Sequence, residues 1–281
     1  MRASTPAETK ERLLSLYQAG TPIAEIEATL GISRPTLYKY IHEQLGPGRY
    51  AARPDHTTWD QAFDELTDQA AYWVGLLLTD GSIVGSGRRV KLSLKIQDTP
   101  TLERFKAFVR TSAPVGEPYA GSRTVRFSSP YMCNRLAALN VVPKKSYIAA
   151  APDCLLDNRN FWRGVIDGDG SVFPNALTSP GLRLCGATSA MLLRQWALVC
   201  SNLSGQSYEP VPRKGRPTVS DVILYGHPAM TVAHWLYRGC SPESPAMERK
   251  LTAYQEMCRI HGSRALTDKG CYVRGRKADR A

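Results

Sequence analysis

The chain has few of the patterns that mark secreted, zinc-binding or membrane proteins. Its seven cysteines are an odd number with no C-x-x-C spacing, so neither a disulfide framework nor a zinc site is indicated and buried thiols are expected. The five histidines form no pair at ligand spacing. No apolar run approaches the roughly 20 residues that cross a bilayer, and the N-terminus is too polar for a signal peptide. We therefore expect a cytoplasmic protein that does not enter a membrane.

Positive charge is what the 281 residues do carry, with a formal net charge of +11 and a pI near 9.4. Such a surface attracts phosphate backbones and predicts a polyanionic partner. Residues 1–50 hold six basic and five acidic side chains, so most of the excess lies downstream. Residues 263–281 form a basic C-terminal tail, for which a solubilising role and a phosphate contact both stay open.

The first 45 residues predict three short helices. Thr5 is a helix N-cap with Glu8 completing a capping box, and this helix runs to Gly20. A second helix follows Pro22, and the glycine of "LGIS" makes the turn before Ser33 caps a third helix. Three short helices with a tight turn between the last two resemble the helix-turn-helix of resolvases and invertases.

The third helix indicates which side chains would meet DNA. Leu37 and Ile41 share one face and are expected to be buried. The opposite face would enter a major groove with Arg34, Thr36, Lys39 and Tyr40. A three-helix protein-interaction bundle is the alternative. Residues 46–68, rich in proline and glycine at their start, are predicted to be a linker with a short helix over residues 57–66.

Two segments of the remaining chain repeat each other. "YWVGLLLTDGSIV" spans residues 72–84 and "FWRGVIDGDGSVF" spans residues 161–173, 89 residues later. One copy would fit a buried helix that ends on a polar residue, but a second copy predicts an internal repeat. The identical positions are Trp73 with Trp162, Gly75 with Gly164, Asp80 with Asp169, Gly81 with Gly170 and Ser82 with Ser171.

Strand patterns follow each copy. "RRVKLSLKIQD" and "TVRFSS" alternate apolar with basic or polar residues, and strands around "LRLCGAT" and "TVSDVILYG" occur in the second half, with helices between them. The economical description is an α+β fold with two tandem α-β-β-α-β-β-α units after a small all-α domain. The polar faces are expected to contact DNA through Arg89, Lys91, Ser93, Lys95, Gln97, Arg126, Ser128 and Arg183.

The paired segments resemble the two signature helices of LAGLIDADG homing endonucleases in their single-chain, pseudo-dimeric form. The resemblance covers residues 69–262 and implies two pseudo-symmetric halves, 69–150 and 151–262, that form a DNA-holding saddle. It also implies that the two helices pack along their small residues. In that family the last acidic residue of each helix binds metal beneath the DNA.

These roles agree with the chemistry of the residues. Gly75 and Gly164 would let the helices touch, because no side chain separates their backbones. Asp80 and Asp169 would then repel each other unless a divalent cation, Mg²⁺ or Mn²⁺, lies between them. The expected metal-binding residues are Asp80, Asp169, Gly81 and Gly170. The sixth motif position carries Leu78 in one half and Asp167 in the other, so an acid there is not required for the chemistry.

The family also uses a basic residue late in each half. Lys145 in "VVPKKSY" and Lys250 in "PAMERKLTAY" match it and are expected to stabilise charge on the phosphate as further catalytic residues. A solvated surface lysine is the alternative, above all for Lys250.

The expected function is site-specific cleavage of double-stranded DNA by a monomer that associates with the nucleoid. A non-catalytic transcriptional regulator on the same scaffold is the alternative, but it would gain nothing from retaining both Asp80 and Asp169. An RNA maturase is disfavoured, because the deep, narrow major groove of RNA excludes a recognition helix.

Overall fold

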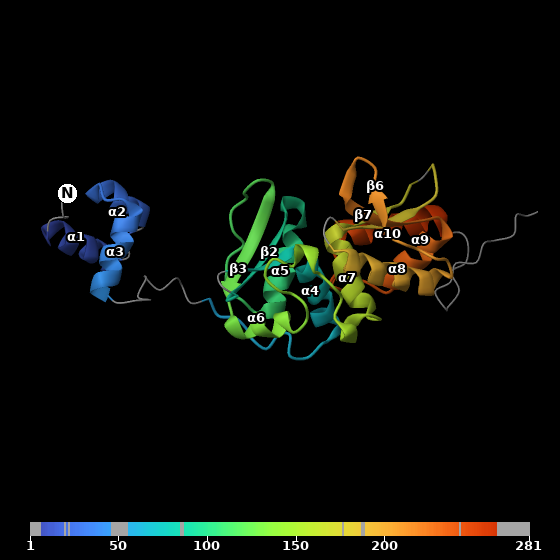
Figure 1. The fold of residues 1–281 in the computed structure, drawn as a ribbon, viewed down its shortest axis with the longest axis horizontal. Helices are drawn as coiled ribbons and strands as arrows, with labels where there is room; N and C mark the ends of the chain where they lie inside the picture. Colours follow the sequence, from blue (N-terminus) through green and yellow to red (C-terminus); the bar gives the residue numbers. More distant parts are fainter. Residues whose placement is uncertain are drawn as a thin grey trace, which may run out of the picture. The chain divides into compact units, whose positions relative to one another are not determined.

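The computed structural model describes residues 7–19, 21, 23–45, 56–84, 87–175, 177–186, 189–241 and 243–262. The chain divides into two compact units, residues 1–55 (unit 1) and 56–281 (unit 2), which are drawn in Figure 1. The predicted basic tail, residues 263–281, and residues 46–55 of the predicted linker lie outside the described residues.

Unit 1 is a bundle of three helices: α1 (Ala7–Gln18), α2 (Ile23–Leu30) and α3 (Arg34–Leu45). Leu37 and Ile41 of α3 are buried, as predicted, in a small core with Leu13, Tyr17 and Ile26. Gly31 adopts a φ of +62° in the turn between α2 and α3, a conformation that glycine reaches without strain. The predicted helix-turn-helix is therefore present.

Unit 2 consists of two α+β halves. Its first half runs through α4 (Asp68–Thr79), β1 (Gly81–Val84), β2 (Arg89–Lys95), the short η1 (Ile96–Asp98), α5 (Thr99–Val109), β3 (Ser122–Ser128) and α6 (Pro130–Ala137). Two 3-10 turns follow, η2 (Lys145–Tyr147) and η3 (Asp153–Leu155). The second half runs through α7 (Arg159–Asp169), β4 (Gly170–Phe173), β5 (Gly181–Gly186), α8 (Ala190–Ser204), β6 (Val211–Arg213), β7 (Arg216–Tyr225), α9 (His227–Tyr237) and α10 (Glu248–His261).

Each half builds one antiparallel sheet. The strand order is β1-β2-β3 in the first and β4-β5-β7-β6 in the second. Helices α4 and α7 lie side by side at the centre of unit 2, with one sheet on each flank (Figure 1). The repeated tryptophans anchor equivalent helices, because the ring of Trp73 lies 5.2 Å from Phe105 of α5 and that of Trp162 lies 5.2 Å from Trp196 of α8.

The alternating strand patterns produce two faces on each sheet. Val90, Leu92 and Leu94 of β2 are buried in the core, as are Leu182 and Leu184 of β5. Successive side chains of a strand point to opposite faces, so the intervening residues lie on the other face. We call this the open face of each sheet.

Two details of the predicted fold are wrong. Residues 57–66 form turns rather than a helix, because the amide of Trp59 donates to the carbonyl of Val109 and that of Thr57 to the hydroxyl of Ser112. The first sheet has three strands in its described part, not four. Its missing strand would be residues 113–119, which form two isolated bridges, and the prolines there cannot donate to a ladder.

The thiols are less uniformly buried than expected. Cys133 and Cys200 are buried, but Cys154 is exposed and Cys185 is half-buried. None of the helices in the described residues is both long and apolar enough for a membrane span.

Candidate active site

Helices α4 and α7 cross at two glycines. A Cβ atom on Gly75 would overlap the backbone carbonyl of Phe161, and one on Gly164 would overlap the backbone carbonyl of Tyr72. Phe161 follows Tyr72 by the same 89 residues that separate the glycines, so the contact is self-complementary, as at a two-fold interface. Any larger side chain at either position would force the helices apart.

This crossing brings the two motif aspartates together. Asp80 is the C-cap of α4 and Asp169 is the last residue of α7. Between them, a Cβ on Gly168 would overlap the hydroxyl of Thr79 and lie 3.3 Å from a carboxyl oxygen of Asp80. Thr79 and Gly168, the small residues at the seventh motif position, therefore let the two helix ends meet. The two repeated segments alone did not indicate this role.

The pair of carboxyl groups is electrostatically strained. Burial, followed by the nearby charge of Asp169, raises the pKa of Asp80 from 3.8 to about 7, although Lys250 and Lys145 act to lower it. Asp169 is exposed as a whole residue, but its carboxyl group is surrounded by protein. This loss of hydration raises the pKa of Asp169 as well. A site that disfavours two negative charges is suited to a bound cation.

A buried lysine lies behind each carboxylate. Lys145, at the start of η2, is 6% exposed and donates to the carbonyl of Gly81. Lys250, in the first turn of α10, is 2% exposed and donates to the carbonyls of Gly170 (2.9 Å), Ile166 and Asp167. Burial lowers the pKa of both ammonium groups, that of Lys250 to about 8. Neither side chain is a solvated surface lysine, the alternative considered from the sequence.

Gly81 and Gly170 have a steric reason to follow the aspartates. A Cβ on Gly81 would lie 2.6 Å from the carbonyl of Leu77, and a Cβ on Gly170 would lie 2.6 Å from that of Ile166. Their own carbonyls accept hydrogen bonds from the lysines, so these oxygens have at most one lone pair left for the metal-binding role expected of them.

The donor set fits a hard divalent cation. No cluster of three or more His, Cys, Asp or Glu side chains with metal-binding geometry occurs among the described residues. Asp80 and Asp169 are the side chains that could hold such an ion, and water oxygens would complete the coordination of Mg²⁺.

The sixth motif position differs sharply between the halves. Leu78 is packed in the core, whereas Asp167 is fully buried and accepts hydrogen bonds from Tyr72 (2.8 Å), Tyr237 (2.7 Å) and the amide of Met247 (2.6 Å). Met247 is the N-cap residue of α10, the helix that carries Lys250, so Asp167 ties this helix to α7 and α4. Burial raises the pKa of Asp167, opposed by Lys250 and these hydrogen bonds.

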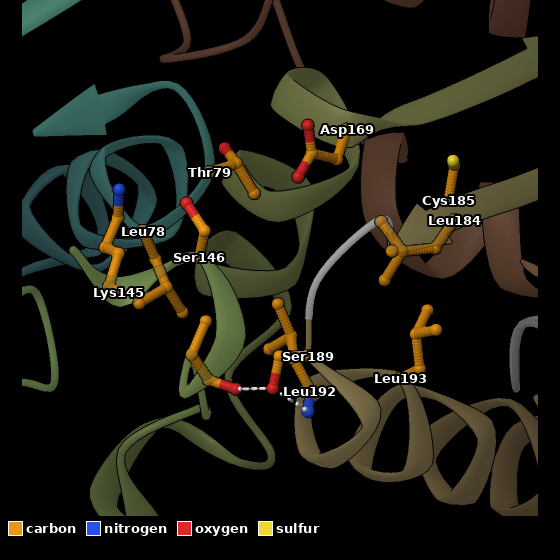
Figure 2. A pocket seen from close by; sticks show the side chains of 12 residues that line it. Leu78, Thr79, Lys145, Ser146, Asp169, Leu184, Cys185, Ser189, Leu192 and Leu193 are labelled. Atoms are coloured by element: carbon orange, nitrogen blue, oxygen red, sulfur yellow. Dashed lines mark hydrogen bonds between the residues drawn. The ribbon is translucent and has the colours of Figure 1, made fainter. Parts of the chain in front are cut away.

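A pocket of about 270 Å³ opens beside Asp169. Figure 2 shows Lys145 and Ser146 on one side of it, Cys185 on the other, and Thr79 and Asp169 above. The pocket therefore lies between the end of the first half and strand β5 of the second half.

The open face of the first sheet is basic and polar. Exposed or half-buried predicted DNA-binding residues lie along it or at its end: Arg89, Lys91, Ser93, Lys95, Gln97, Arg126 and Ser128. Ser93 exchanges a hydrogen bond of 2.8 Å with Thr124 on the neighbouring strand. In the described part of the chain, no carboxylate forms an ion pair with the basic residues of this face.

The open face of the second sheet is less basic. Arg183 lies over the ring of Phe173 at 5.4 Å, and its Nε has no hydrogen-bond partner in the described structure. Ile223 lies beside Arg183 on β7. Arg213 forms a bidentate ion pair with Asp221. The sequence reasoning missed this pair, although the alternation of "TVSDVILYG" places Asp221 on the polar face.

The four residues of unit 1 that are predicted to contact DNA differ in the interactions that they make within the unit. Arg34 pairs with Glu27 at 2.9 Å, the hydroxyl of Thr36 lies 2.9 Å from that of Ser33, and Lys39 lies 3.8 Å from Glu43. Tyr40 is half-buried against the core with Lys10 over its ring at 4.5 Å, so it is less outward than expected.

Comparison with known proteins agrees with the resemblance of the N-terminal helices to a resolvase domain. A family model of the helix-turn-helix domain of resolvase matches residues 6–44. A search of curated proteins finds no match.

Among solved structures, the chain is similar to the I-SmaMI LAGLIDADG homing endonuclease bound to cleaved DNA, with 12% identity, 73% of this chain and 93% of that chain covered, and a TM-score of 0.48. The LAGLIDADG homing endonuclease I-GzeII in complex with its DNA target shows 10% identity, coverage of 73% and 94%, and a TM-score of 0.47. I-SmaMI bound to an uncleaved DNA target in the presence of calcium ions shows 12% identity, coverage of 73% of this chain and 95% of that chain, and a TM-score of 0.45.

Proposed function

We propose that the chain is a site-specific endonuclease of double-stranded DNA, a homing endonuclease that hydrolyses phosphodiester bonds with a divalent metal. The observation that carries the proposal is the convergence of Asp80 and Asp169 at two helix ends, each backed by a buried lysine. A protein that only bound DNA would gain nothing from two like charges held together near phosphates. Catalysis gives this arrangement a reason.

Asp80 and Asp169 are the residues that would hold Mg²⁺ or Mn²⁺. Such an ion, when bound, lowers the pKa of a water molecule and stabilises charge on the phosphodiester. Lys145 and Lys250 would add fixed positive charge beside the same phosphates. Their carbonyl partners hold both ammonium groups in place before DNA arrives.

Unit 1 would add affinity rather than chemistry. Arg34, Thr36 and Lys39 of α3 would enter a major groove next to the cleavage site. The predicted linker, residues 46–68, would raise the effective concentration of the cleaving unit near its target. The enzyme would act as a monomer, because one chain carries both carboxylates, and in the cytoplasm, where a nucleoid lies.

Replacing each carboxylate by its neutral isostere tests the proposal. Asp80→Asn and Asp169→Asn should each nearly abolish double-strand cleavage of a plasmid in Mg²⁺ while binding DNA in Ca²⁺ almost as well as the unchanged protein. Asp157→Asn, an exposed position outside the site, is the matched control and should cut normally. Full cleavage by both single variants would exclude the assigned catalytic role. Loss of affinity equal to the loss of rate would indicate misfolding, which thermal melting would reveal.

Removing residues 1–45 tests the role of unit 1. The shortened chain should still cut at low salt, because the site lies wholly in unit 2. It should bind more weakly at physiological salt, because it makes fewer phosphate contacts and its binding therefore releases fewer counterions. Its footprint on the DNA should shorten on one side only. An unchanged footprint and affinity would favour the protein-interaction alternative for these three helices.

A further inference from the structure

A carboxylate on the open face of the second sheet is unexpected in a surface that would meet a polyanion. Asp221 lies on β7, opposite Cys185 of β5 and Val211 of β6, and is 5% exposed. It accepts hydrogen bonds from Arg213, Nε to Oδ2 at 2.9 Å and Nη2 to Oδ1 at 2.7 Å. The same Nη2 lies 3.2 Å from Sγ of Cys185. Three strands thus contribute to one cluster.

Asp221 is ionised within this cluster. Burial acts to raise its pKa, but hydrogen bonds from Arg213 and Cys185 outweigh burial and lower the pKa below its usual value. The ion pair has no net charge, so it adds little to the attraction for phosphates. On the first sheet, by contrast, Lys91 and Arg126 form no ion pair in the described structure. A face built only to hold a DNA backbone would leave Arg213 equally unpaired.

What the ion pair supplies is orientation. Two hydrogen bonds to one carboxylate fix the plane of the Arg213 guanidinium, as side-on pairing does. Its Nη1 bonds to no described residue, and 29% of the side chain stays exposed. Because Nε and Nη2 are already bonded, Nη1 is the nitrogen left to donate, and a fixed Nη1 can donate to the N7 or O6 acceptor of a guanine in the major groove.

We propose that Arg213, positioned by Asp221, reads one guanine in the DNA half-site that the second sheet contacts. This inference rests on the proposed DNA-cleaving function. Cys185 also lines the pocket that Asp169 borders, so the guanine lies on the second-half side of the cleaved bonds. Arg213 is a specificity-determining residue, and Asp221 acts through it.

The test begins with the full chain and a target recovered from a pool of random DNA duplexes. Each guanine of that target is replaced in turn by 7-deazaguanine, which lacks the N7 acceptor, and the affinity is measured in Ca²⁺. One replacement should weaken binding by the unchanged protein about tenfold or more. Arg213→Ala should weaken binding to the unmodified target by a similar factor and be insensitive to that one replacement, while every other guanine behaves alike in both proteins.

Two further variants separate base reading from charge. Arg213→Lys keeps the positive charge but loses the planar group that Asp221 orients, so it should bind unrelated DNA normally and lose the discrimination. Asp221→Asn should also lose discrimination, yet bind unrelated DNA more tightly, because the positive charge of Arg213 is then no longer balanced. A purely structural role for Asp221 would instead weaken both kinds of binding.

Lys214→Ala is the matched control, since it removes one exposed positive charge from the adjacent turn. It should weaken binding to all sequences evenly and lower the salt slope by about one unit. The same even loss for Arg213→Ala, or full sensitivity of Arg213→Ala to every 7-deazaguanine, would overturn the inference and make Arg213 a phosphate contact. If the unchanged protein selects a target and cuts it, either result leaves the proposed function intact. If it selects and cuts no DNA, the proposed function fails first.

Discussion

In the first half of unit 2, Lys145 donates to one carbonyl and the sixth motif position is an apolar Leu78. In the second half, Lys250 donates to three carbonyls and the same motif position is a buried carboxylate, Asp167. The helix crossing itself is the same from both sides, glycine against backbone. The halves thus agree at the crossing and at the aspartates.

The open faces of the two sheets differ as much as the lysines and the sixth motif positions do. The first sheet presents basic side chains that form no ion pairs in the described structure, while the second presents Arg213 already paired with Asp221. On the proposed function the two halves would meet different DNA sequences, so they would have no reason to keep the same contact residues. Two halves that must bring Asp80 and Asp169 together have every reason to keep the same crossing.

The largest effect is expected at the crossing. Gly75→Ala and Gly164→Ala should each lower the free energy of unfolding by about 4 kcal/mol, because the new Cβ meets backbone that cannot move aside. In a helix without such a contact, alanine would be more stable than glycine by about 1 kcal/mol. A loss of stability on substitution would therefore report the contact between the two helices. All five tryptophans lie in unit 2, and their fluorescence in urea reports its unfolding. Clearly unequal losses would show that the crossing is not equivalent from both sides.

A smaller loss is expected at the sixth motif position. Asp167→Leu, which copies the first half, should lower the free energy of unfolding by about 3 kcal/mol, because two buried hydroxyls and one amide lose their acceptor. Tyr237→Phe removes one of these donors and should cost about 1 kcal/mol in the same urea titration. If Asp167→Leu were neutral or stabilising, the carboxylate would not be what joins α10 to the paired helices.

An effect smaller than that of Asp167→Leu, and of opposite sign, is expected at Asp80. The folded-state pKa of Asp80, about 7, lies above its ordinary 3.8, so its contribution to stability is full below pH 3.8 and is lost as the pH rises through 7. Without metal, Asp80→Asn should therefore stabilise the protein by about 1 to 2 kcal/mol at pH 8 and by much less at pH 4.

Added Ca²⁺ gives the complementary measurement. It should raise the melting temperature of the unchanged protein, since binding to the folded state alone stabilises it, and should do so less for Asp80→Asn. Equal responses to Ca²⁺ in the two proteins would place the cation away from Asp80.

Much of the fold follows from local pattern. The alternation around residues 88–98 predicts β2, and the spacing of Leu37 and Ile41 predicts the buried face of α3. The repeat predicts which glycines and aspartates are equivalent, because both copies must satisfy the same packing. The helix expected over residues 57–66 is absent, since its polar groups pair with residues 109–112, and no local pattern reports such distant partners.

The sequence by itself determined the duplication, the helix-turn-helix and the identity of the motif residues, because these depend on order and spacing along the chain. Only the tertiary structure decided that Lys145 and Lys250 are buried against carbonyls, that Asp167 binds three donors and that Arg213 is held by Asp221. The physical reason is that burial and charge pairing depend on atoms brought together from distant parts of the chain, and these set both pKa values and side-chain orientation.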